Sequence, residues 1–222
     1  MQEFLRPTPA VDSDNELIRN LSLDLTRGLN KEDEKAIRLF YWVRDEIKYR
    51  PLVPLDLFED YRASRTLESG IGFCVEKAAV LMALGRVAGI PGRFHLADIR
   101  NHLISDRLIK VMRTNVFICH GYCELFLKGK WVKATPAFDL EMCRENRIEP
   151  VEFDAEHDAV FHSHNLDGEL HIEYVRDRGS YSDVPMRHIL DMWKKSYDPG
   201  CMDRVSRYIE EQEAWKIENK MH

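Results

Sequence analysis

The segment from Cys74 to Pro91 constrains the fold more than any other part of this 222-residue chain. Apolar residues cover most of the circumference of a helix that begins near Cys74 and ends at Gly89, where Pro91 blocks any continuation. A helix that is apolar on nearly every side has to be buried on nearly every side. The sequence therefore predicts a central helix around which the other elements pack.

The pattern changes to that of strands after this helix. Residues 116–127 are rich in β-branched and aromatic side chains, and residues 131–134 resume the pattern after Lys128-Gly129-Lys130. Gly129-Lys130, taken as a two-residue turn, makes these two segments a hairpin. Asp167-Gly168 predicts a second hairpin, between Phe161 and Val175.

Helices are expected on both sides of this strand-rich part. Asn30 is a good N-cap for a first helix, and acidic residues follow it in the first turn, where they suit the helix dipole. This first helix is expected over residues 30–49, and two more helices are expected over 186–197 and 203–220. A helical half followed by an antiparallel sheet indicates an α+β fold. We expect a single domain over residues 1–222.

Composition excludes several classes of protein. The net charge of −6 argues against a broad nucleic-acid interface, which needs an excess of Lys and Arg. The first ten residues lack the apolar core of a secretory signal, and the longest apolar stretch, 78–90, is too short to cross a bilayer. The odd number of cysteines, five, suggests reduced thiols rather than a disulfide framework. We therefore expect a cytoplasmic protein without membrane or nucleic-acid partners.

Cys74 and His120 are the residues most suited to nucleophilic chemistry. Cys74 begins the central helix, where unpaired backbone N–H groups and the helix dipole stabilise a thiolate. His120 shares one face of its strand with Tyr122, while Cys119 and Cys123 point to the other face. A structural thiol and a half-exposed strand histidine are the alternatives for each residue alone.

The residues around Cys74 and His120 resemble the transglutaminase-like superfamily. The resemblance lies in Gly72-Phe73-Cys74, in the helix that ends with Arg86 and in the turn Gly89-Ile90-Pro91-Gly92-Arg93. It continues in His120-Gly121-Tyr122-Cys123-Glu124 and in Trp131-Val132, and it covers about residues 35 to 140. The C-terminal extension, about 141–222, adds little to it.

This resemblance implies a papain-like core, in which a cysteine-bearing helix packs against an antiparallel sheet that carries the histidine. It also implies thioester chemistry on glutamine or other carboxamide groups, with Cys74 as nucleophile and His120 as its base. No metal or organic cofactor is then required. The expected substrate is a protein, a peptide or a small carboxamide.

The third catalytic residue is left open between two positions. Members of the family commonly have Asp directly before Pro in the tryptophan strand, but Thr135 precedes Pro136 here. With Gly129-Lys130 as the turn, residue 128 pairs with 131 and Asp139 lies opposite His120. We therefore predict Asp139 as the residue that orients His120, with Thr135 as the alternative.

Papain-like enzymes use a glutamine side chain to stabilise the oxyanion, but the only glutamines here are near the chain ends. The backbone N–H of Cys74 is therefore the expected donor. The indole of Trp42, on the preceding helix, is a second candidate donor, although core packing is its simpler role. The loops over 50–66 and 98–113 are expected to build the channel for the acyl acceptor.

Four histidines crowd the second predicted hairpin. With Asp167-Gly168 as a tight turn, His164 faces His171 and His162 faces Glu173. Three imidazoles and a carboxylate on one face could hold a divalent metal ion, whereas a polar, solvent-facing strand surface is the alternative. We predict no metal as part of the catalytic site.

Two functions are consistent with these features. The first is cysteine-dependent acyl transfer to an amine, or hydrolysis, of carboxamide or peptide bonds through a thioester of Cys74. The second is a catalytically inactive binding or scaffold module that keeps the fold, an alternative that Thr135 supports because it replaces the expected carboxylate.

Overall fold

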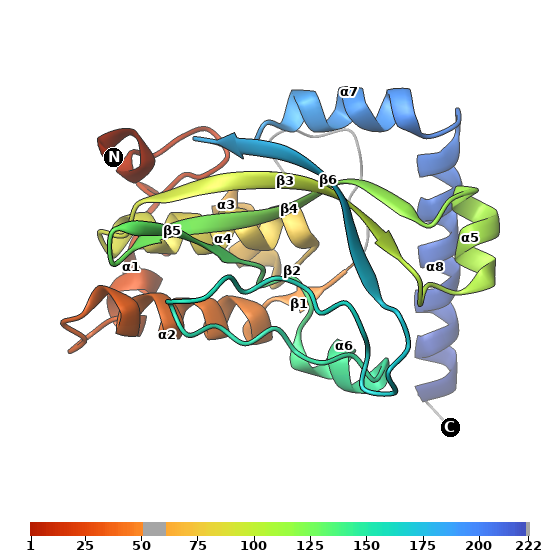
Figure 1. The fold of residues 1–222 in the computed structure, drawn as a ribbon, viewed down its shortest axis with the longest axis horizontal. Coiled ribbons are helices and arrows are strands. Elements are labelled where there is room, and N and C mark those ends of the chain that lie inside the picture. Colours follow the sequence, from red (N-terminus) through yellow and green to blue (C-terminus); the bar gives the residue numbers. More distant parts are fainter. Residues whose placement is uncertain (51–60, 221–222) are drawn as a thin grey trace.

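The structure is a computed structural model that describes residues 1–50 and 61–220, with side chains described as far as residue 212. Figure 1 shows a central sheet with helices around it. The helices are η1 (Gln2–Leu5), α1 (Glu16–Leu25), α2 (Glu32–Glu46), α3 (Ala63–Ser69), α4 (Cys74–Val87), α5 (Asp106–Met112), α6 (Leu140–Glu145), α7 (Met186–Ser196) and α8 (Cys201–Lys220). The strands are β1 (Lys48–Tyr49), β2 (Ile71–Gly72), β3 (Gly92–Asn101), β4 (Val116–Leu127), β5 (Lys130–Ala134) and β6 (Ile172–Tyr181).

Helix α4 is the centre of the core, as its sequence predicts. Every residue from Cys74 to Arg86 is buried. Helices α1, α2 and α3 pack against it, and its remaining side faces β4 and β3. A shell of helices on one side and a sheet on the other accounts for the absence of a polar face on α4. The mixture of helices with an antiparallel sheet confirms the predicted α+β class.

The sheet has the order β5-β4-β3-β6, with every neighbouring pair antiparallel. Gly121 in β4 allows α4 to lie close to the strand. A Cβ atom at Gly121 would come within 2.6 Å of the Phe94 ring and 3.1 Å of the Val75 Cα. Any side chain there would therefore push the first turn of α4 away from β4. The short parallel pair β1–β2 leads the chain into this first turn.

The turn between β4 and β5 differs from the predicted one. The turn residues are Lys128 and Gly129, both with positive φ (50° and 82°), and Leu127 pairs with Lys130. Two successive positive φ angles are typical of the tight turns that match the twist of a hairpin. The register is consequently two residues away from the predicted one, and the pairing that placed Asp139 opposite His120 is wrong.

The C-terminal part contributes the edge strand of the same sheet. β6 pairs with β3, and the second predicted hairpin is reduced to one isolated bridge between His164 and Leu170. Helix α8 then packs against α5, and buried side chains form a separate small apolar cluster there. These side chains are Met112, Cys201, Val205 and Ile209. Figure 1 shows α5 and α8 together at one end of the sheet.

Several segments differ from their predicted structure. The helix expected over 30–49 is the shorter α2, whose N-cap is Lys31 rather than Asn30. Helices α1 and α3 were not predicted. The segment 98–113, predicted as a loop, contains the end of β3 and all of α5. Part of the loop predicted over 50–66, residues 51–60, lies outside the described residues, and Ala63 begins α3.

Candidate active site

Cys74 is the first residue of α4, as predicted, and its surroundings fix that position. The preceding N–H of Phe73 donates to the Glu76 carboxylate at 2.9 Å, which ties the start of the helix to its own first turn. Gly72 leaves room for this contact, since a Cβ atom there would lie 2.9 Å from the Thr66 side chain and 3.1 Å from Glu76. The sequence Gly72-Phe73-Cys74 thus presents the thiol at a rigid strand-to-helix junction.

Burial dominates the electrostatics of the Cys74 thiol. The residue is 9% exposed, and loss of solvation raises its pKa to about 12. The backbone N–H groups of Gly121 and Val75 act in the opposite direction but do not compensate. Burial therefore opposes the thiolate that the helix start favours, although backbone donors lie close to the sulfur.

His120 lies in β4 beneath aromatic rings. It is 4% exposed, and its ring centroid lies 4.9 Å from that of Phe161, 5.9 Å from Tyr122 and 6.2 Å from Tyr174. Burial lowers its pKa to about 3, and its Nε2 atom is buried without a hydrogen-bond partner among the described residues. At neutral pH the imidazole is uncharged and can accept a proton.

One cavity of about 260 Å³ brings Cys74 and His120 together. The two predicted residues line it side by side with Cys119, Phe138 and Phe161. Trp42 does not line it and packs against the core instead. The indole that does line it belongs to Trp193 of α7, whose Nε1 donates to the Ile118 carbonyl at 2.7 Å. Trp193 could not be singled out from sequence, because nothing local to it indicates a site.

The Asp139 carboxylate is engaged elsewhere. One oxygen accepts the N–H groups of Glu141 and Met142 at the start of α6, and the other accepts the Tyr49 N–H at 2.7 Å. It also lies near the buried ammonium of Lys77, whose charge helps to lower the pKa of Asp139. No hydrogen bond joins Asp139 to His120 among the described residues. Tyr49 and Met142 both line the cavity, so Asp139 fixes two parts of its wall.

Thr135 follows the last pair of the β4–β5 ladder. Its N–H donates to the Ala159 carbonyl at 2.9 Å, and its side chain is buried. The hydroxyl has no partner of good hydrogen-bond geometry among the described side chains. Burial raises the pKa of Tyr174, and the nearby Thr135 hydroxyl opposes part of that rise. Thr135 and the His120 Nε2 are thus both buried polar groups that lack well-formed hydrogen bonds.

The predicted cluster of histidines is dispersed in the structure. His171 is buried, whereas His164 is exposed and contacts Ser163, and Glu173 pairs with Arg100 at 2.8 Å. His162 lies against the Pro150 carbonyl at 3.3 Å. Within residues 1–50 and 61–212, whose side chains are described, no three His, Cys, Asp or Glu side chains are arranged to hold a metal ion. The suggested facing pairs are not formed, because His164 pairs with Leu170, one position before His171, and Glu173 lies opposite Arg100 of β3.

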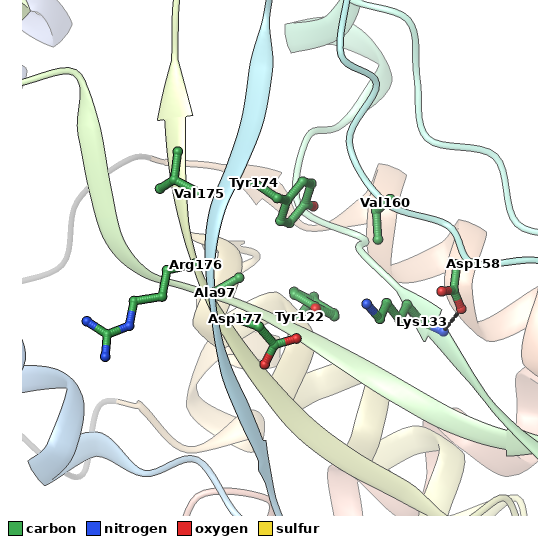
Figure 2. A pocket seen from close by; sticks show the side chains of 9 residues that line it. All are labelled: Ala97, Tyr122, Lys133, Asp158, Val160, Tyr174, Val175, Arg176 and Asp177. Atoms are coloured by element: carbon green, nitrogen blue, oxygen red, sulfur yellow. Dashed lines mark hydrogen bonds between the residues drawn. The ribbon is translucent and has the colours of Figure 1, made fainter.

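A second pocket lies beside Tyr122 and Tyr174. Figure 2 shows charged side chains of both signs around it, among them Lys133, Asp158 and Asp177. The Lys133 ammonium lies 5.9 Å from the centre of the Tyr122 ring. This pocket contains no cysteine and no histidine among its described lining residues, and the predicted pair Cys74 and His120 lines the other cavity.

Comparison with known proteins agrees with this geometry. The family model of the transglutaminase-like superfamily matches residues 19–136, more than half of the chain. The chain belongs to the transglutaminase-like superfamily. The match includes Cys74, His120 and Thr135, and it ends before Asp139. Among curated proteins, no sequence matches this chain.

Solved structures are similar to this chain at low sequence identity, and the first of them shows the fold. A candidate cysteine protease from Cytophaga hutchinsonii has a TM-score of 0.52 and 16% identity, over 84% of this chain and 48% of that one. A candidate protease from Parabacteroides distasonis has a TM-score of 0.42 and 19% identity, over 57% and 24%. The periplasmic domain of TgpA from Pseudomonas aeruginosa has a TM-score of 0.38 and 19% identity, over 55% and 42%. The chain thus spans about half the length of the first of these proteins and less of the other two. In the described part of the chain, no helix is long and apolar enough to cross a membrane.

Proposed function

We propose that the protein is a cysteine-dependent enzyme that transfers or hydrolyses acyl groups of carboxamide or peptide bonds. Cys74 Sγ attacks the carbonyl carbon, and the thiol proton passes to the His120 imidazole. The imidazolium then donates this proton to the departing amine or ammonia, and a thioester of Cys74 remains. Water, or an amine, attacks the thioester and restores the thiol. The observation that carries the proposal is the shared cavity of Cys74 and His120.

The pKa directions define how this pair would work. Because burial raises the pKa of Cys74 and lowers that of His120, the resting pair is a neutral thiol and a neutral imidazole. Proton transfer therefore accompanies attack on the carbonyl, with His120 as a general base. The N–H groups of Gly121 and Val75 favour the sulfur anion as it forms.

The role of Asp139 follows from its contacts. Its carboxylate oxygens accept three backbone N–H groups, which positions Tyr49 and Met142 in the cavity wall. We assign Asp139 as a positioning residue of the wall and leave the orientation of His120 to the aromatic rings around it. This differs from the triad that the sequence suggested, in which Asp139 holds the imidazole.

A binding or scaffold module remains the second candidate function. It is favoured by one specific observation, the buried His120 Nε2 that no described group accepts from or donates to. Thr135 stands where the family commonly has a carboxylate to fill that role. A chain that had lost turnover would retain the cavity and the fold without this partner.

The test is activity against glutaminyl peptides and small carboxamides, with and without an added primary amine. We expect release of ammonia, or of an amine from peptides, and a mass increase on the protein that hydroxylamine reverses. Incorporation of the added amine would identify transfer, and ammonia release without incorporation would identify hydrolysis.

Cys74→Ala should abolish both signals, and Cys119→Ala is the matched control because Cys119 is also buried and lines the same cavity. Turnover that survives Cys74→Ala would overturn the mechanism. The absence of any turnover or adduct in the unmodified protein would support the binding module.

A further inference from the structure

The cavity around Cys74 extends from the thiol to the α5–α8 pair. Met112 of α5 and Val205 of α8 belong both to its wall and to the small apolar cluster between these helices. Leu108 of α5 and Met202 of α8 line it as well. The family match ends at residue 136, so the wall formed by α8 belongs to the C-terminal extension of this chain. A feature outside the shared core is a natural place for substrate selectivity.

The wall of this cavity carries no Asp, Glu, Lys or Arg among the described residues. Two of its polar side chains are bonded to the backbone of β4. The Trp193 indole donates to the Ile118 carbonyl, and the Tyr197 hydroxyl accepts the Ile118 N–H at 2.8 Å. His120, also in the wall, is neutral at pH 7, since burial lowers its pKa to about 3. A charged ligand group would therefore lose its hydration there without gaining an ionic partner.

The size of the cavity narrows the choice further. An apolar cavity of about 150 Å³ accommodates benzene, and the volume here is about 260 Å³. The space therefore fits an apolar group of about eight carbons. The pocket in Figure 2 offers the opposite chemistry, with Lys133 and Asp177 facing its interior, but it lacks the nucleophile.

We propose that this cavity binds the acyl portion of the substrate and that the acyl group is apolar, aliphatic or aromatic, with about eight carbons. The inference rests on the proposed function, because it takes the thioester of Cys74 as given. Side chains of α5 and α8 then set the length of the acyl group that is accepted.

The experiment uses three p-nitrophenyl esters with the full-length protein: acetyl, octanoyl and the monoester of octanedioic acid, which carries a terminal carboxylate. Cys74 Sγ forms the thioester bond, the ester C–O bond breaks, and p-nitrophenolate leaves with the electron pair while the thiol proton passes to His120. Absorbance of p-nitrophenolate and the mass of the labelled protein give the acylation rate. Cys74→Ala sets the background.

We expect the octanoyl ester to acylate Cys74 at least 30-fold faster than the acetyl ester. Burial of each methylene supplies about fourfold, so six methylenes set a ceiling of about 4 × 10³-fold. The octanedioyl ester should return to within about threefold of the acetyl ester. Val205→Trp, which fills the cavity from α8, should lower the ratio of the octanoyl rate to the acetyl rate to about threefold or less. Ser206→Trp, at the next position of α8 and outside the cavity wall, should leave both rates unchanged.

A second variant covers the case in which Val205→Trp does not fold. Leu108→Ala enlarges the cavity from α5 and should shift the preference from the octanoyl toward a dodecanoyl ester. Equal rates for the acetyl, octanoyl and octanedioyl esters at Cys74 would overturn this inference and leave the proposed function standing. Failure of every ester to label Cys74 would overturn both.

Discussion

The two ends of α4 bury polar groups in opposite ways. At the C-terminal end, the guanidinium of Arg86 donates to the carbonyls of Arg6, Gly92 and Ser182, at 2.6, 3.0 and 2.5 Å. At the N-terminal end, the His120 Nε2 is buried without a hydrogen-bond partner among the described residues, in the cavity that Cys74 also lines. Buried polar groups are normally paired, because an unpaired one costs free energy. The C-terminal end of α4 is thus anchored by hydrogen bonds. At the N-terminal end, an unpaired polar group is buried in the proposed active site.

The largest effect should separate the two ends by activity. Cys74→Ala should lower turnover by at least about 10⁴-fold, because the nucleophile is removed. Its free energy of unfolding should change by no more than about 1 kcal/mol, since one buried sulfur is lost from a site with few polar contacts. Steady-state kinetics and urea unfolding of the same preparation measure both. A large decrease in the free energy of unfolding would show that the Cys74 thiol contributes to stability as Arg86 does.

Arg86→Met should produce the reverse result. The substitution leaves three carbonyls without their donor, and we expect a loss of about 3–5 kcal/mol in the free energy of unfolding. Arg93→Met is the comparison, because Arg93 is partly exposed and pairs mainly with Glu124, at 2.5 Å. It should cost less than half as much by urea unfolding. Similar losses for the two variants would contradict the distinction between the ends of α4.

The pH dependence of stability should identify the buried histidine. The folded pKa of His120, about 3, lies below the unfolded value near 6.5. Between these two pKa values the unfolded chain binds a proton at His120 and the folded chain does not. The contribution of His120 to the free energy of unfolding is therefore complete above pH 6.5 and is lost as the pH falls toward 3. At pH 5 the loss is about 2 kcal/mol.

His120→Phe should remove that dependence while leaving stability at pH 7 within about 1 kcal/mol. Unfolding in urea at several pH values measures the slope. His171→Phe provides a second, independent case, because burial also lowers the pKa of His171, to about 4. An unchanged slope in the His120 variant would mean that its ring is not buried as described.

The smallest effects concern the two residues proposed from sequence to orient His120. Asp139→Ala should cost about 2 kcal/mol, since three backbone N–H groups lose their acceptor, and should lower turnover less than tenfold. Thr135→Val should change stability by less than about 1 kcal/mol and turnover by less than threefold. A loss of turnover near 10⁴-fold in folded Asp139→Ala would instead restore Asp139 as the third catalytic residue.

The buried helix could be predicted from sequence because a single pattern determined it. The apolar surface of α4 and the stop at Gly89 and Pro91 are local, and its burial followed directly. The turn after β4 was harder, because Lys128-Gly129 and Gly129-Lys130 contain the same kinds of residue. A shift of one position in the turn moved the register by two and carried Asp139 away from His120.

The place of Cys74 in the fold could be predicted from sequence, but the burial of its thiol could not. The position at a helix start was correct, yet the pKa depends on burial, which the packing of α4 on Gly121 decides. The four histidines failed as a group for a related reason. The partner of β6 is β3 rather than the segment around His164, and that pairing is distant in sequence.

The position of β6 also has a consequence for truncated and partly synthesised chains. β3 pairs on one side with β4, which follows soon after it, but its other edge remains open until residues 172–181 emerge. A fragment ending at residue 136, where the family match stops, would expose this edge permanently. Unpaired edges recruit strands of other molecules. The extension thus covers the β3 edge and protects the sheet from self-association. A nascent chain is expected to be prone to aggregation until β6 has been synthesised.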